Sequence, residues 1–314
     1  MDLWAPHGSG VPQTPPYPRG WAWVIAHPTT MGGWSAMESD GKVGADHVAQ
    51  DARARWEGLG RVNGPLTRPW RLTDAEAARV RVDPMGVMRR FVGGDLTAKR
   101  ILLACGGGGQ QSAALGLLGA RVTVVDQDAG QLARDHETWA SHGLPDGWLA
   151  TVRADIRDLA LFSLPNAPFD LVWMPYAINF VPDCRPVIAA IASQVAPGGL
   201  FRLQSANPFV LGMHPDDRAG DAYLRRGTYV DGDRVEAADP DWVYDRSLGI
   251  DVPRAVEYRH TLATLINATV AAGFRIVHLE DAVDVPMDPN EAPGTWDHFC
   301  ATNPPWLAIW AMRA

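Results

Sequence analysis

The feature that most constrains this chain is a run of four glycines, Gly106–Gly109, between a buried strand and a helix. The apolar run Ile101–Ala104 precedes it and predicts a strand covered on both faces. A second strand, Arg121–Val125, follows the helix and ends in Asp126. Glycines at such a turn let the backbone approach a ligand closely, and the acid accepts both hydrogens of a ribose diol. The pattern therefore predicts an α/β sheet that binds a nucleoside.

The alternation of strands and helices continues to strand 200–204, is broken over residues 208–256, and resumes with the helix 261–272. Short apolar runs separated by helical patterns predict a parallel sheet with right-handed crossovers. The predicted strands are 101–104, 121–125, 151–154, 169–174, 200–204, 274–279 and 306–311. The predicted helices between them are 110–118, 128–141, 186–195 and 261–272.

Four regions follow from this pattern. Residues 1–95 are expected to form an N-terminal arm and helical cap, and residues 96–207 a Rossmann-like core. Residues 208–257 form an acidic, turn-rich insertion after strand five, and residues 258–314 complete the core. Within the cap, helices are predicted at 45–59, after the capping box 73–76 and at 85–91. Within the insertion, a hairpin is predicted at 231–233.

Composition narrows the possible functions. The chain has 314 residues and a formal net charge of −8, which argues against binding to duplex nucleic acid. It contains no apolar stretch long enough to span a bilayer, and its first residues lack the pattern of a secretory signal. We therefore expect a cytoplasmic monomer or homodimer that acts on a small molecule, with no membrane partner.

No metal site is expected. The three cysteines, Cys105, Cys184 and Cys300, are scattered and form no disulfide framework or metal-binding pair. His214, Asp216 and Asp217 lie close together, but an acidic, turn-rich segment is typical of a solvated loop.

Two classes of nucleoside are compatible with the glycine turn. The dinucleotide pattern G-x-G-x-x-G would place its third small residue at Ser112, and a dinucleotide requires a helix N-terminus facing its pyrophosphate. S-adenosylmethionine carries no phosphate, and it needs only backbone contact with its aminobutyrate chain.

The order of the remaining segments resembles the class I S-adenosylmethionine-dependent methyltransferases, over about 100–207 and 258–314. The segments that carry the resemblance are Arg100–Gly109 (motif I), Val124–Asp126, Ala154–Ile156, Phe169–Tyr176, Val195–Leu200 and Ala271–Phe274. The resemblance implies a Rossmann-like seven-stranded methyltransferase sheet, with S-adenosylmethionine as methyl donor or as substrate. It also implies cofactor binding by Cys105, Gly106, Gly107, Gly109, Asp126, Gln127, Asp155, Ile156, Met174 and Tyr176.

Motif I departs from the family pattern, which reads acid-x-Gly-x-Gly-x-Gly. Leu103 stands at the place of the acid and Cys105 at that of the first glycine. The family's acid helps to orient motif I near the amino group of the cofactor, so another group must bind that ammonium here. The glycine run followed by Gln110–Gln111, together with Pro175–Asp183, resembles one bacterial small-molecule subgroup.

Tyr176, Asn179 and His298 are the candidate catalytic residues. Tyr176 follows the fourth strand, at the edge where open α/β sheets bind ligands, and its ring suits a sulfonium while its hydroxyl suits an acceptor. Catalysis and a local turn hydrogen bond explain Asn179 equally well. His298 precedes the last strand, where the family often places acceptor contacts, although a structural histidine is the commoner case. Two roles, a lid over the pocket and packing in the core, are equally compatible with the aromatic residues Tyr17, Trp21, Trp34 and Trp56.

The leading hypothesis is methyl transfer to a small-molecule acceptor in secondary metabolism. Pro175–Tyr176 resembles part of the Asn/Asp-Pro-Pro-Tyr motif of amino-methylating relatives, and this resemblance implies a nitrogen acceptor, although Met174 stands where those relatives carry another proline. A second hypothesis is a cyclase of the azetidine-2-carboxylate synthase type, in which the amine of S-adenosylmethionine attacks its own γ-carbon and releases methylthioadenosine. An NAD-dependent oxidoreductase and a non-catalytic binding module are further alternatives.

Overall fold

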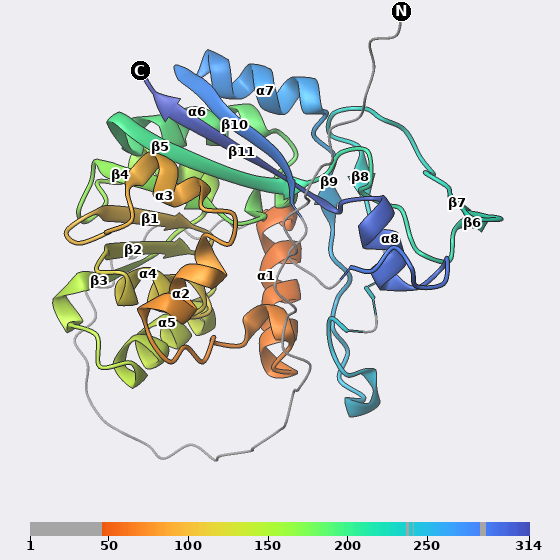
Figure 1. The fold of residues 1–314 in the computed structure, drawn as a ribbon, viewed down its shortest axis with the longest axis horizontal. Coiled ribbons are helices and arrows are strands. Elements are labelled where there is room, and N and C mark those ends of the chain that lie inside the picture. Colours follow the sequence, from red (N-terminus) through yellow and green to blue (C-terminus); the bar gives the residue numbers. More distant parts are fainter. Residues whose placement is uncertain (1–45, 237–238, 241, 283–286) are drawn as a thin grey trace, which may run out of the picture. The chain divides into compact units, whose positions relative to one another are not determined.

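A seven-stranded sheet with strand order β10-β11-β5-β4-β1-β2-β3 forms the centre of the structure (Figure 1). The strands are β1 (Arg100–Ala104), β2 (Arg121–Asp126), β3 (Leu149–Arg153), β4 (Phe169–Met174), β5 (Val195–Ala206), β10 (Phe274–Ala282) and β11 (Trp306–Arg313). The first five run parallel, whereas β11 lies antiparallel between β5 and β10. This topology confirms the predicted α/β class and the predicted number of strands.

This computed structural model describes residues 46–236, 239–240, 242–282 and 287–314. The predicted arm over the first 45 residues, with Tyr17, Trp21 and Trp34, lies outside the described residues. Among the described residues, no helix is long and apolar enough to cross a membrane.

Helices cover both faces of the sheet, which explains the continuous apolar strands. Leu102 and Ala104 face a core shared with α6 (Cys184–Gln194) and α7 (Leu262–Ala271). Ile101 and Leu103 face the opposite core, shared with α4 (Gln111–Leu117) and α5 (Ala129–Ser141). Successive side chains of β1 therefore alternate between two layers. The glycine loop follows directly after the carboxyl end of this strand.

The N-terminal helices were predicted to within a few residues. They are α1 (His47–Arg61), α2 (Ala75–Val82) and α3 (Val87–Val92). Helices α2 and α3 pack on the same face of the sheet as α4, whereas α1 packs against Val243 and Val252 of the insertion. Asp74 caps α2 by accepting the Ala77 N–H at 2.8 Å, so the predicted capping role of Thr73 is wrong.

The insertion does not contain the hairpin predicted at 231–233. Gly232 takes a left-handed turn (φ +77°), but the short β8 (Arg234–Val235) that follows pairs with the distant β9 (Glu257–Tyr258). A different hairpin joins β6 (Arg218–Ala219) to β7 (Ala222–Tyr223). Pairing with β9 brings the end of the insertion back toward the sheet.

One short helix was not predicted. α8 (Trp296–Thr302) lies in the loop before the last strand, and the Thr295 hydroxyl caps it by accepting the His298 N–H at 3.3 Å. The 3-10 helices are η1 (Pro65–Thr67), η2 (Asp146–Trp148), η3 (Ile156–Leu161), η4 (Ala177–Phe180) and η5 (Arg246–Leu248).

Candidate active site

The glycine loop leaves the carboxyl end of β1 in a conformation that few side chains tolerate. Cys105 adopts a left-handed backbone (φ +57°), and its N–H donates to the Val125 carbonyl at 2.7 Å. Such a conformation costs a non-glycine residue about 1–2 kcal/mol. A side chain at Gly107 would place its Cβ 2.8 Å from Gln131 Cβ and 3.0 Å from Asp126 Oδ2. The loop therefore keeps the close approach expected of motif I, with cysteine in the place of one glycine.

Asp126 ends β2 directly beside this loop. Its Oδ2 accepts the Gly107 N–H at 3.2 Å, and its Oδ1 accepts the Asp128 N–H at 3.0 Å. Burial raises the pKa of this carboxyl to about 6, although the hydrogen bonds from the backbone oppose the change. The predicted ribose acid and the predicted glycine loop are thus in direct contact.

A second carboxylate beneath the loop was not predicted. Asp135 of α5 is fully buried, and it accepts the N–H groups of Gly108 at 3.2 Å and Gly109 at 3.0 Å, together with the Ser112 hydroxyl. Burial raises its pKa to about 7 against the effect of these hydrogen bonds. The signal in the sequence was an acid between Leu132 and Trp139 on the apolar face of a helix.

Tyr176 follows β4 and lies at the same edge of the sheet. Its backbone is left-handed (φ +62°), and it precedes η4. The preceding Pro175 Cγ lies 3.3 Å from the position that a Cβ would take at Gly106, so the end of β4 abuts the glycine loop. The Tyr176 ring meets Phe180 edge-on at 6.2 Å, and Phe180 in turn meets Trp56 of α1 at 6.0 Å.

Protein contacts hold three of the predicted cofactor-binding residues, Asp155, Ile156 and Met174. Asp155 ends β3, accepts the Arg157 N–H at 2.9 Å and pairs with the Arg157 guanidinium at 2.6 Å. The same guanidinium pairs with Asp46 at 2.7 Å, which lowers the pKa of Asp46 to about 2. Ile156 and Met174 are buried in the core. Contact of these three predicted residues with a cofactor stays a prediction.

The methyltransferase domain family matches residues 102–203, which span the glycine loop, Asp126, Asp155 and Tyr176. The chain is also 26% identical over 197 residues to the uncharacterized methyltransferase YbaJ of Bacillus subtilis (strain 168), covering 62% of this chain and 73% of the relative. These two matches, over residues 102–203 and over 197 residues, support the class I S-adenosylmethionine-dependent methyltransferase family. S-adenosylmethionine is the cofactor of that family.

Two solved structures share the fold. Magnesium protoporphyrin IX methyltransferase from Synechocystis PCC 6803, with bound S-adenosylmethionine, has a TM-score of 0.51 and 14% identity over 86% of this chain and 99% of its own. The [4+2]-cyclase SpnF has a TM-score of 0.51 and 15% identity over 84% of this chain and 94% of its own. At these identities the comparison shows the fold of the chain.

The residues around Asp126 fit the cofactor of the family. The side-chain oxygens Oε1 of Gln127 and Gln131 are buried and have no hydrogen-bond partner within the described ranges. Gln131 Oε1 lies 2.9 Å from the position that a Cβ would take at Gly108. Unpaired buried acceptors are costly, and S-adenosylmethionine offers hydroxyl, amino and ammonium donors.

A buried carboxylate beside Tyr176 was also missed by sequence reasoning. Glu257 of β9 lies in the insertion, is 6% exposed, and accepts a hydrogen bond from the Tyr176 hydroxyl. Burial raises the pKa of Glu257 to about 6, opposed by Tyr176 and by the charge of Arg55. The local sequence gave no signal, because the insertion is rich in acids that lie on the surface.

Asn179 and His298, both predicted to be catalytic, differ in their surroundings. Asn179 is buried in η4, where its Oδ1 accepts the Ala206 N–H at 2.8 Å and its Nδ2 donates to the Tyr258 carbonyl at 3.2 Å. It therefore joins β5 to β9 at the edge of the sheet. His298 lies in α8, where its Nδ1 hydrogen-bonds the Tyr223 hydroxyl at 2.7 Å. In the view of Figure 1, α1 lies between α8 and β1. Asn179 thus lies within η4, which directly follows Tyr176, whereas His298 contacts Tyr223 of the insertion. A catalytic role for either residue stays a prediction.

No group of three potential metal ligands occurs within the part of the chain that the structure describes. His214 and Asp216 pair at 3.3 Å in a loop, and Asp216 is largely exposed.

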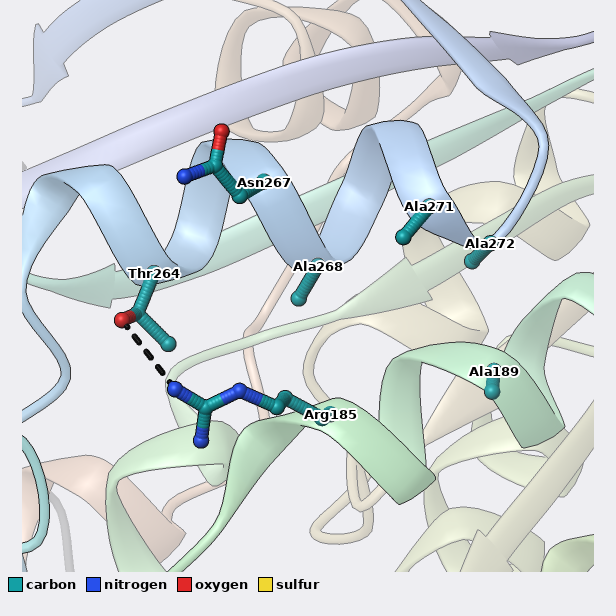
Figure 2. Close-up of a pocket in the computed structure, with 7 residues that line it drawn as sticks. All are labelled: Arg185, Ala189, Thr264, Asn267, Ala268, Ala271 and Ala272. Atoms are coloured by element: carbon teal, nitrogen blue, oxygen red, sulfur yellow. Dashed lines mark hydrogen bonds between the residues drawn. The ribbon is translucent and has the colours of Figure 1, made fainter.

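A pocket of about 480 Å³ lies between α6 and α7 (Figure 2), and none of the predicted site residues lines it. Its lining residues are Arg185, Ala189, Thr264, Asn267, Ala268, Ala271 and Ala272. The glycine loop, Asp126 and Tyr176 lie instead at the carboxyl edge of β1, β2 and β4, and this edge is the candidate active site.

Proposed function

We propose that this protein transfers a methyl group from S-adenosylmethionine to a small-molecule acceptor. The observation that carries the proposal is the contact of Asp126, the glycine loop and the end of β4 at one edge of the sheet. Open α/β sheets bind their ligands at the carboxyl ends of the strands. The negative net charge favours a small molecule over a nucleic acid as acceptor.

The chain's own residues would bind and orient the two reactants. Asp126 would accept the ribose hydroxyls, and Gln127, whose buried Oε1 has no partner among the described residues, would accept from the adenine amino group. The backbone of Gly106 and Gly107 allows close approach of the methionine tail. S-adenosylmethionine supplies an activated methyl group on sulfur, so the protein has to align the acceptor with it and exclude water.

Tyr176 is the residue that we place at the reacting end. Its ring meets Phe180, which in turn meets Trp56, and this row of aromatic rings suits a sulfonium or a flat acceptor. Its hydroxyl is hydrogen-bonded to Glu257, which fixes its orientation.

Calorimetric titration with S-adenosylmethionine and with NAD tests the cofactor. We expect S-adenosylmethionine to bind, and Asp126→Ala to weaken that binding by about 1–3 kcal/mol, the value of a charged hydrogen bond. Binding of NAD alone, or unchanged affinity in Asp126→Ala, would contradict the proposal.

Product analysis separates transfer from the cyclase alternative. The protein is incubated with S-adenosylmethionine alone and then with a panel of small acceptors. S-adenosylhomocysteine that forms only with an acceptor supports transfer. Methylthioadenosine together with a cyclic amino acid, formed without any acceptor, supports the azetidine-2-carboxylate synthase type of reaction.

A further inference from the structure

Glu257 is a buried carboxylate whose charge the surrounding protein does not neutralise. Among the described residues it has no ion-pair partner, and the Tyr176 hydroxyl is its hydrogen-bond donor. The nearby Arg55 is committed elsewhere, because its guanidinium binds both carboxylate oxygens of Asp239 at 2.5 and 2.8 Å and the Pro253 carbonyl at 2.9 Å. Arg55 and Asp239 cancel each other, so an ionised Glu257 leaves one net negative charge in this buried cluster.

The fold holds Glu257 at the candidate active site. The neighbouring Tyr258 carbonyl accepts from Asn179 at 3.2 Å, and His260 Nε2 hydrogen-bonds the Ile178 carbonyl at 3.0 Å. Both contacts join the segment around β9 to η4, which directly follows Tyr176. Pro175, which precedes Tyr176, abuts Gly106, so the segment that carries the partner of Glu257 adjoins the glycine loop.

An unpaired buried carboxylate is destabilising, and such groups are concentrated at functional sites. A cation that pairs with the carboxylate and also contacts the face of the neighbouring aromatic ring would relieve this cost. An ammonium group has both properties. Strand β1, which leads into the glycine loop, offers no carboxylate to such a group, because Ile101, Leu102 and Leu103 are apolar and buried.

We propose that Glu257, oriented by Tyr176, binds an ammonium group of one of the two reactants. This inference rests on the proposed function. The ammonium belongs either to an amine acceptor or to the methionine tail of S-adenosylmethionine, and the two sources share the same chemistry at Glu257.

The test uses Glu257→Gln, which keeps the size of the side chain and an oxygen that accepts from Tyr176 but removes the charge. Glu280→Gln is the control, because Glu280 is a half-buried glutamate that also accepts a hydrogen bond from an aromatic side chain, Trp310 Nε1 at 3.1 Å, on the edge strand β10. Circular dichroism and thermal unfolding establish that each variant is folded. Should Glu257→Gln fail to fold, Tyr176→Phe replaces it in the same titrations.

Binding is measured by calorimetry for S-adenosylmethionine and for methylthioadenosine, which lacks the aminobutyrate group. Butylamine and benzylamine, with butanol and benzyl alcohol as uncharged counterparts, are titrated into protein saturated with S-adenosylhomocysteine. A cofactor ammonium predicts that Glu257→Gln weakens S-adenosylmethionine binding by about 10- to 100-fold and leaves methylthioadenosine unchanged. An acceptor ammonium predicts unchanged S-adenosylmethionine binding, with amine but not alcohol binding lost in Glu257→Gln.

The pH dependence gives a second readout. The charged and titratable groups that act on Glu257 are Tyr176, Arg55 and Asp239, and its pKa of about 6 places its loss of charge below neutrality. Amine or cofactor binding should therefore weaken below pH 6 in the wild type, and the part due to Glu257 should be missing from Glu257→Gln. Asp126 has a pKa in the same range, so its effect is present in both proteins. The contribution of Glu257 is therefore the difference in pH-dependent affinity between the wild type and Glu257→Gln.

The outcomes separate this inference from the proposed function. If wild type binds S-adenosylmethionine through Asp126 but Glu257→Gln binds every probe as the wild type does, the ammonium site is wrong and the proposed function stands. If the wild type does not bind S-adenosylmethionine at all, the proposed function itself fails. Equal losses in Glu257→Gln and Glu280→Gln would show a general structural effect and would also overturn the ammonium site.

Discussion

Replacing Asp135 by asparagine should remove a specific pH dependence of stability. Asp135 lies beneath the glycine loop, and burial raises its pKa to about 7. In an unfolded chain the pKa of an aspartate is about 4. Because the folded value is the higher one, the contribution of Asp135 to stability is fully present below pH 4 and is lost as the pH rises through 7.

The magnitude follows from the size of the change in pKa. A difference of about three pKa units between folded and unfolded states corresponds to about 4 kcal/mol in the free energy of unfolding. Asparagine has the same shape and can still accept the Gly109 N–H, while the Gly108 N–H keeps the Gln131 carbonyl at 3.1 Å as a partner. The substitution therefore removes the titration and about one hydrogen bond.

Denaturant unfolding followed by tryptophan fluorescence at pH 4 to 8 measures this difference. Relative to Asp135→Asn, the wild type should lose about 4 kcal/mol across that range. Asp74→Asn is the control, because the Ala77 N–H lowers the pKa of this exposed helix cap and its contribution is lost as the pH falls. Parallel curves for wild type and Asp135→Asn would refute the reasoning.

Two further substitutions test the packing around the site. Gly109→Ala should destabilise the protein by about 2–3 kcal/mol, because the backbone is left-handed (φ +73°) and the new Cβ would lie 2.2 Å from Thr138 Oγ1. Gly147→Ala, which meets no atom within 4 Å, should change the free energy of unfolding by less than about 0.5 kcal/mol in the same denaturant assay. Asn179→Ala should cost about 2–4 kcal/mol by leaving the Ala206 N–H and the Tyr258 carbonyl without partners, and calorimetry should then show weaker S-adenosylmethionine binding. Unchanged stability in Asn179→Ala would contradict its role in joining β5 to β9.

Local sequence was sufficient where a structural element depends on its own residues. The apolar run 101–104 has to be buried on both faces, and the positive φ values of Gly108 and Gly109 suit residues without a side chain. Helix α7 also begins within one residue of its predicted start, where the Thr261 hydroxyl caps it by accepting the Thr264 N–H at 3.2 Å. Asp126 was predicted correctly as the acid at the end of β2, beside the glycine loop.

Local sequence failed where a partner lies far along the chain. The turn at Gly232 is present, but β8 pairs with β9 and not with a neighbouring strand, because a short polar strand takes whichever partner the fold brings to it. Asp135 was overlooked because its partners are the backbone N–H groups of Gly108 and Gly109, which no side-chain pattern reveals.

The amino-acid sequence alone determined the strand–glycine–helix–strand unit, its acid and the family to which it points, because these depend on periodicity and on glycine conformations within about 25 residues. Only the tertiary structure decided that Glu257 of the insertion meets Tyr176 at the end of β4. The physical reason is that burial and the neutralisation of charge are properties of the packed chain: an acid in a polar segment is an ordinary surface residue until folding removes it from water.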